Sequence, residues 1–145
     1  MATSKPETVF IRGVNKHLPT TYFEKTNNPF RGGIADVWYS GTKSDLWVEY
    51  KYEPSLPRTR TYLPKLSALQ VQWLGNRHAE GRNVAVILGL PEGGVIFTEL
   101  GWLQPHTRAE LLARTVSRPE LAKWIHFRVG DSPCKLLDAS RMPRE

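Results

Sequence analysis

Two neighbouring apolar runs decide the fold of this chain: residues 34–39, which read IADVWY, and residues 45–52, which read DLWVEYKY. Strand side chains alternate between two faces, so Glu49 and Lys51 share one face of the second run. The linker between the runs, SGTKS, has turn chemistry, so the two runs predict a β-hairpin. A suitable register places Asp36 of the first run beside Glu49.

Two carboxylates and a lysine on one face of a sheet suit chemistry on a phosphodiester. Asp36 and Glu49 would hold a hard divalent cation, for which Mg²⁺ is the best fit and Mn²⁺ a substitute. The cation would lower the pKa of an attacking water, and Lys51 would position or polarise that water. The alternative is an ordinary ion pair on a solvated strand, and taken alone the acid–acid–lysine pattern is a weak one.

Further motifs make the pattern more specific. The run FRGGIADVWY at residues 30–39 is followed by LWVEYK at residues 46–51 and by LSALQ at residues 66–70. Together these motifs resemble the PD-(D/E)XK nuclease superfamily, over roughly residues 7–97. Within it they are most similar to the small phage VRR-Nuc and Holliday-junction-resolvase-like nucleases. Ala35 stands where that family usually has a proline, which shapes the backbone and carries no chemistry.

The resemblance implies a metal-dependent endonuclease that hydrolyses DNA without a covalent enzyme intermediate. It implies Asp36, Glu49 and the backbone carbonyl of Tyr50 as metal ligands, with Lys51 and Gln70 as catalytic side chains. It also implies branched DNA as substrate and a symmetric homodimer. The alternatives are a nuclease for single-stranded, flap or duplex DNA, and a non-catalytic DNA-binding or inhibitory protein on a nuclease fold.

Two of the candidate side chains have competing roles. Gln70 points along the apolar face of a helix that we expect to begin at Ser67. There it would bond either a water or phosphate near Lys51, or backbone at the rim of the core. Glu7 lies on the core stripe of a first helix, and in the related nucleases a glutamate on that helix commonly faces the metal. Glu7 also fits a capping box with Ser4.

Basic side chains surround these motifs and suit phosphate contacts, which position DNA without reading its sequence. The candidates are Arg31, Arg58, Arg60, Lys65, Arg77 and Arg82. Arg58 and Arg60 are the best two, because the proline-punctuated loop 53–65 follows directly on the strand of the predicted site. For any one of them a solvated surface position is the alternative.

Two tryptophans flank the predicted acidic pair. Trp38 lies two residues after Asp36, and Trp47 lies two residues before Glu49. Large aromatic side chains on sheet faces usually pack, so we predict core positions for both. Stacking on splayed bases is the alternative.

The order of apolar patterns along the chain predicts an α/β fold with a mixed central sheet flanked by helices. The resemblance implies the restriction-endonuclease-like αβββαββ core, with a C-terminal helical addition. The first helix carries the apolar stripe Phe10, Val14 and Leu18, and the second has an apolar face of Leu66, Leu69, Trp73 and Leu74. The predicted elements are helix 4–18, strands 21–25, 34–39 and 45–52, helix 67–80, strands 83–90 and 95–97, and helices 107–114 and 119–127.

Composition narrows the class of protein and of partner. The chain has 145 residues, a net charge of +6 and one cysteine, Cys134. We expect a single domain over residues 1–145, with a core at about 4–100 and a helical extension at about 101–145. The basic charge favours DNA as partner. A lone cysteine fits a reducing compartment, and the absence of a signal region or membrane-length apolar run predicts the cytoplasm, that of the host cell if the chain is phage-encoded.

Overall fold

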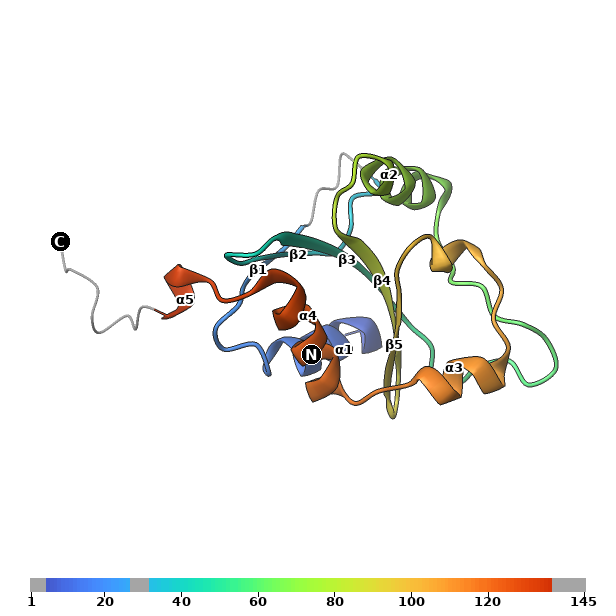
Figure 1. The fold of residues 1–145 in the computed structure, drawn as a ribbon. Helices are drawn as coiled ribbons and strands as arrows, with labels where there is room; N and C mark the ends of the chain where they lie inside the picture. Colours follow the sequence, from blue (N-terminus) through green and yellow to red (C-terminus); the bar gives the residue numbers. More distant parts are fainter. Residues whose placement is uncertain (1–4, 27–31, 137–145) are drawn as a thin grey trace.

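The computed structural model describes residues 5–26 and 32–136, and the order of its elements begins as the sequence predicts (Figure 1). A helix, three strands, a helix and two strands are followed by further short helices. The elements are α1 Pro6–Asn15, β1 Tyr22–Lys25, β2 Val37–Ser40, β3 Asp45–Tyr52, α2 Ala68–Ala79, β4 Val84–Leu90, β5 Gly93–Phe97, the 3₁₀ turn η1 Gly101–Leu103, α3 Arg108–Arg114, α4 Arg118–Val129 and α5 Pro133–Leu136.

The five strands form one mixed sheet in the order β1-β2-β3-β4-β5. All neighbours are antiparallel except β3 and β4, which run parallel. Parallel neighbours need a long crossover, which here consists of the loop after β3 and the helix α2. The predicted α/β class and mixed sheet are therefore confirmed.

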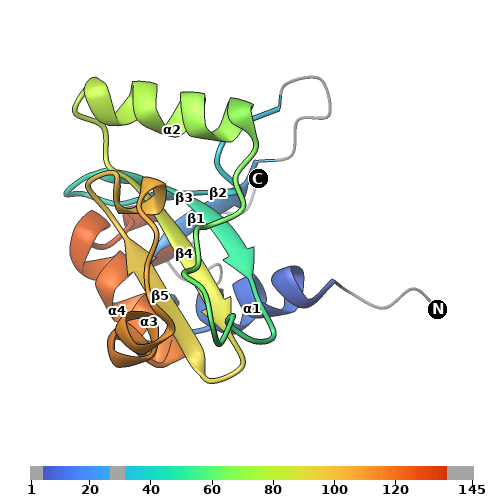
Figure 2. The same ribbon diagram turned by 90° about the vertical axis from the view of Figure 1, so that its right-hand side faces the viewer.

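Helices lie on both sides of the sheet: α2 on one side, α1 and α4 on the other (Figures 1 and 2). The predicted stripe Phe10, Val14 and Leu18 is buried, at 1%, 0% and 3% exposure. The helix is shorter than predicted, because α1 ends at Asn15 and Leu18 lies in the turn that follows it. The stripe packs with α4 and with the β3 side chains Leu46 and Val48 in one apolar cluster. This cluster fixes α1 against the central strand of the sheet.

A second apolar cluster fills the α2 side of the sheet and is built mainly over β4 and β5. All residues of β4 are buried, as the continuous apolar run predicts. Leu74 of α2 is fully buried there, whereas Leu69 is 55% exposed. The prediction for Leu69 is wrong, because the first turn of α2 lies against the glycines at 32–33 rather than over the core.

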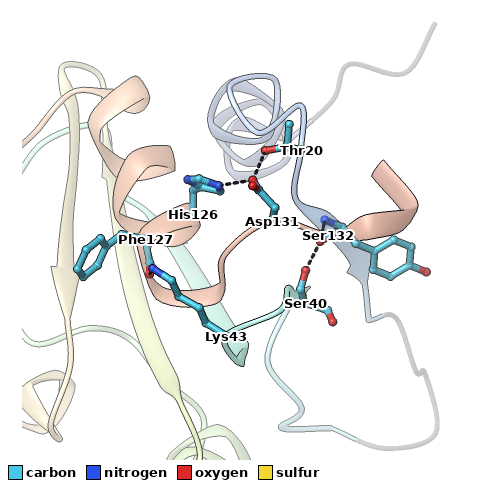
Figure 3. Close-up of polar contacts among 8 residues, drawn as sticks. Thr20, Ser40, Lys43, His126, Phe127, Asp131 and Ser132 are labelled. Atoms are coloured by element: carbon cyan, nitrogen blue, oxygen red, sulfur yellow. Dashed lines mark hydrogen bonds and ion pairs between the residues drawn. The ribbon is translucent and has the colours of Figure 1, made fainter. Parts of the chain in front are cut away.

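The chain after α4 is tied to the hairpin side of the sheet by polar contacts (Figure 3). The Asp131 carboxylate accepts a hydrogen bond from the Thr20 hydroxyl at 3.0 Å, and its Oδ1 lies 2.6 Å from Nε2 of His126. The Ser132 amide donates to the carbonyl of Thr20 at 2.9 Å, and the Ser132 hydroxyl donates to the carbonyl of Ser40. These contacts hold the start of edge strand β1 in place.

No helix in the described part of the chain combines the length and the apolar character needed to cross a bilayer.

Candidate active site

The register of the β2–β3 hairpin brings the two predicted carboxylates together. Val37 pairs with Val48, so the next pair along the ladder is Asp36 with Glu49. Strand β2 begins at Val37, one residue later than Asp36 and three later than the sequence predicts. Asp36 therefore lies at a bend just before β2, where its side chain can turn toward the backbone of β3.

Because β2 begins only at Val37, main-chain groups of Tyr50 on β3 are left for the site. The Tyr50 amide donates to Oδ2 of Asp36 at 2.9 Å, in place of a bond to a neighbouring strand. The amide and carbonyl of one strand residue point to the same side, so the Tyr50 carbonyl also points toward the side where Asp36 lies. This is the position that a main-chain ligand beside Asp36 requires.

Glu49 is the centre of the polar cluster. Its side chain is only 2% exposed, and its Oε2 accepts a hydrogen bond from the Gln70 amide nitrogen at 3.0 Å. Lys51 Nζ lies 3.5 Å from the same oxygen, and the Lys51 side chain is 20% exposed. Oε1 of Glu49 is buried without a hydrogen-bond partner. One oxygen is thus held by protein groups while the other is left for something else.

Burial dominates the electrostatics of the carboxylate pair. It raises the pKa of Glu49, and the negative charge of Asp36 raises that pKa further. Burial also raises the pKa of Asp36, against the stabilising hydrogen bond from the Tyr50 amide. Two adjacent acids in a low-dielectric site resist being ionised together unless a cation accompanies them. The pair is therefore stabilised by positive charge, which Lys51 already supplies 3.5 Å from Glu49 and to which a bound cation would add.

Glu7 approaches this cluster from α1. It is half-buried, and burial raises its pKa, with the charge of Asp36 as the second cause and Lys51 acting in the opposite direction. The N-cap of α1 is Lys5, which makes no side-chain capping bond, and Pro6 is the first helical residue. Glu7 is then the second residue of the helix, so the predicted capping box is wrong. The predicted Ser4 cap lies outside the described residues.

Gln70 makes the backbone bond that was one of its two predicted roles, and it also bonds Glu49, whereas a bond to a water or phosphate near Lys51 stays a prediction. The side-chain Oε1 of Gln70 accepts a hydrogen bond from the backbone amide of Ser67 at 2.9 Å. The Ser67 hydroxyl accepts one from the backbone amide of Gln70 at 3.1 Å. This is a capping box at the start of α2, and it leaves the Gln70 side-chain NH₂ for Glu49. The Ser-x-x-Gln spacing of residues 67–70 is the sequence signal for such a box.

A divalent cation fits these donors. Mg²⁺ is usually bound through one or two carboxylates and keeps several waters. Asp36 and Glu49 are two such carboxylates, and the buried Oε1 of Glu49 has no hydrogen-bond partner in the protein. Within residues 5–26 and 32–136, no three acidic, histidine or cysteine side chains together form a metal-binding group. Glu7 is a neighbour of the pair, close enough for the charges of Asp36 and Lys51 to act on its pKa.

The predicted phosphate contacts differ in their surroundings. Arg58 and Arg60 are exposed and line a surface hollow of about 490 Å³ together with Arg108, which sequence analysis did not single out. Lys65 is 78% exposed, and its Nζ lies 3.6 Å from Oε2 of Glu53. Arg31 lies outside the described residues. In the sequence, the only indication of a role for Arg108 is its basic side chain, because its place beside Arg58 and Arg60 depends on the fold.

The two tryptophans beside the site are only partly buried. Trp47 packs against the edge of the second apolar cluster, whereas Trp38 belongs to neither cluster. The predicted core position is therefore wrong for Trp38. The reason is that the apolar cluster on this face lies over β4 and β5 and does not extend to β2.

Comparison with known proteins shows a likeness of fold. The Holliday junction resolvase Hjc of the hyperthermophilic archaeon Archaeoglobus fulgidus matches with a TM-score of 0.53 and 19% sequence identity, over 77% of this chain and 98% of that chain. No protein-family model matches the chain, and no curated protein matches it in sequence. The chain is thus an α/β protein whose fold is similar to that of an archaeal Holliday junction resolvase.

Proposed function

We propose that this protein is a divalent-metal-dependent endonuclease that hydrolyses phosphodiester bonds in DNA. The observation that carries the proposal is the polar cluster on one sheet face, in which Glu49 presents a buried, unpaired Oε1 beside Asp36 and Lys51. The fold likeness to a Holliday junction resolvase supports the same class of reaction. The net charge of +6 supports a polyanionic substrate.

Each residue of the cluster has a role that its contacts suggest. Asp36, Glu49 and the Tyr50 carbonyl would hold Mg²⁺, which when bound supplies Lewis acidity toward water and phosphate. Lys51 points at the same edge and would orient the attacking water or a non-bridging phosphate oxygen. Gln70 holds Glu49 in one orientation through its 3.0 Å hydrogen bond. Glu7 would accept a hydrogen bond from a water on the solvent side.

The finer parts of the proposal concern the substrate and the assembly. Branched DNA is the expected substrate, because the similar fold belongs to a protein that is described as a Holliday junction resolvase. A symmetric homodimer would place two such sites on the two strands that a junction presents for cutting. The narrower likeness to phage VRR-Nuc nucleases stays a prediction from the motifs.

Cleavage of defined DNA structures tests the proposal directly. End-labelled four-way junction, flap, single-stranded and linear duplex DNA would be incubated with Mg²⁺ or with EDTA. The wild-type protein would be compared with Lys51→Ala and with Lys123→Ala, which removes the same charge from an exposed position on α4. Circular dichroism would verify that both variants are folded.

We expect cutting that requires the metal, is lost in Lys51→Ala and is kept in Lys123→Ala. The ranking of the four substrates then separates a junction resolvase from a nuclease of other preference. DNA binding with no cutting under either Mg²⁺ or Mn²⁺ would refute the enzymatic proposal and leave a DNA-binding protein on a nuclease fold.

A further inference from the structure

A row of aromatic side chains crosses the sheet face that carries the polar cluster. The rings of Tyr22 and Trp38 are 5.8 Å apart, those of Trp38 and Trp47 are stacked at 6.0 Å, and those of Trp47 and Trp73 are 5.4 Å apart. The guanidinium of Arg77 lies 5.7 Å from the Trp73 ring and ends the row. Four aromatic rings from β1, β2, β3 and α2 thus form one continuous surface, which we call the aromatic row.

The aromatic row borders the proposed active site along both strands of the hairpin. Trp38 follows Asp36 by two residues, and Trp47 precedes Glu49 by two residues. Two residues of strand span roughly 6–7 Å, and side chains two apart share a face. The Trp38–Trp47 stack therefore lies directly beside the carboxylate pair.

Core packing accounts for only half of the aromatic row. All four rings are partly exposed; Trp47 and Trp73 pack against the second apolar cluster, whereas Tyr22 and Trp38 belong to neither cluster. The indole Nε1 of Trp38 is buried without a hydrogen-bond partner. The Tyr22 and Trp38 rings are thus left for a role other than filling the interior.

A surface hollow lies at each end of the aromatic row. One has a volume of about 490 Å³ and is lined by Trp47 and Trp73, and the other, of about 420 Å³, is lined by Tyr22 and Trp38. Both volumes lie in the range of sites for small molecules or single chemical groups. Flat, partly exposed rings beside such hollows suit another ring.

The charges around the first hollow also favour a neutral ring over a phosphate. Asp45 and Glu80 line it together with Arg77 and Arg82, so the formal charges balance. Glu80 also pairs with Arg77, whose Nε lies 2.8 Å from the carboxylate. A phosphate would gain little there, whereas a nucleobase would gain stacking, which every base can provide.

We propose that the aromatic row stacks unpaired bases of the nucleic-acid substrate, next to the phosphodiester that the carboxylate pair receives. The inference rests on the proposed nuclease function and narrows its substrate to DNA with unpaired nucleotides beside the cut, such as a branch point, a flap or a single strand. Fully paired duplex offers no free base face to the row, so it is the poorer ligand.

Binding without cleavage tests the inference separately from catalysis. Fluorescence anisotropy in EDTA would measure the affinity of the full-length protein for a labelled single-stranded oligonucleotide and for a duplex of the same sequence. The variants would be Trp38→Leu, Trp38→Phe and, as a matched control, Trp124→Leu, because Trp124 is partly buried on α4 on the other side of the sheet.

We expect Trp38→Leu to weaken single-strand binding by roughly 5- to 100-fold, the range for loss of one stacked base. Duplex binding should change far less, Trp38→Phe should recover most of the loss, and Trp124→Leu should bind as the wild type does. The intrinsic tryptophan fluorescence of the wild type should be quenched by the single strand.

Three results would overturn the inference. The first is an unchanged single-strand affinity in a folded Trp38→Leu variant, and the second is an equal loss for single strand and duplex. The third is a shift of Trp38→Leu from dimer to monomer in analytical ultracentrifugation that accounts for the loss, since the aromatic row would then be an interface between two copies. Failure of metal-dependent cutting with intact, Trp38-dependent single-strand binding would instead refute only the nuclease proposal.

Discussion

Glu49 shows at the scale of one residue how a functional site costs stability. It is a carboxylate that is 1% exposed and beside a second acid, and only one of its oxygens has protein partners. A site arranged for a cation leaves such groups strained in the absence of that cation. A substitution that removes the acid of Glu49 should therefore raise the stability of the protein and weaken its binding of the metal.

Replacing Glu49 by glutamine tests that opposition. An acid whose pKa is raised on folding destabilises the folded state above its ordinary pKa, so replacing it by an amide that cannot ionise should raise stability at pH 7 in EDTA. We expect a gain of at least about 1 kcal/mol, because one pKa unit corresponds to about 1.4 kcal/mol. Urea unfolding would measure it, and the rise in melting temperature that Mg²⁺ gives the wild type should be absent. A less stable variant that keeps its response to Mg²⁺ would contradict the assignment.

Gly33 is a second residue on which the site depends. Its φ is +97°, and a Cβ there would lie 2.6 Å from the carbonyl oxygen of Leu69. We expect Gly33→Ala to cost roughly 1–3 kcal/mol and to push the chain before Asp36 away from the helix that carries Gln70. The melting temperature and the cleavage rate would both fall.

Gly75 supplies the matched control for that substitution. It lies inside α2, and a Cβ there would meet no atom within 4 Å. Gly75→Ala should therefore stabilise the protein by up to about 1 kcal/mol through helix propensity alone. If Gly33→Ala were as harmless as Gly75→Ala, the close approach of the two segments would not matter to the site.

At the scale of elements, sequence patterns predicted most of what positions the site. Alternation along residues 45–52 and the turn residues between the runs predicted the hairpin and placed Asp36 beside Glu49, because strand period and turn chemistry are local properties. The Ser67 cap and the continuous apolar run of β4 were equally local.

Features that depend on tertiary packing were beyond the sequence. The exposure of Leu69 and Trp38 depends on where α2 crosses the sheet, and nothing within either segment encodes that crossing. The third arginine of the hollow around Arg58 and Arg60 comes from α3, far along the chain. The fold class follows from element order, whereas these surfaces follow from which elements meet.

The segment after α4 gives a prediction at the element scale. His126 and the Thr20 hydroxyl lower the pKa of Asp131 from its ordinary value of 3.8. Its contribution to stability is then complete above pH 3.8 and is lost as the pH falls through the lower folded-state pKa. Asp131→Asn should lower the melting temperature at pH 7, and the difference from the wild type should shrink below pH 3.8. Glu92→Gln, in the exposed β4–β5 turn, serves as control, and a pH-independent difference would rule out a role for the charge.

At the scale of the whole molecule, the positive charge should act through specific side chains. Each duplex phosphate that a protein neutralises adds about 0.9 to the slope of log affinity against log salt. If Arg58 and Arg60 each contact a phosphate, the double variant Arg58→Ala, Arg60→Ala should reduce that slope by roughly 1.8. Titrations of a junction at several salt concentrations would measure it.

The control for that experiment is the double variant Lys16→Ala, Lys123→Ala. It removes the same charge from exposed positions on the α1 and α4 side of the sheet. An equal change of slope in both double variants would mean that net charge alone sets the salt dependence, and that the hollow around Arg58 makes no direct contact.

The single parallel pair in the sheet also governs the order in which the chain assembles. The β1–β2–β3 meander and the β4–β5 hairpin each join strands that are close in sequence, whereas β3 and β4 meet only after the crossover has closed. Distant pairings form late, because the entropy of loop closure is lost before contacts repay it. In pulsed hydrogen exchange during refolding, we expect amides of the β3–β4 ladder to gain protection last. Asp36 and Glu49 both belong to the early piece, so the acidic pair would form before the sheet that buries it is complete.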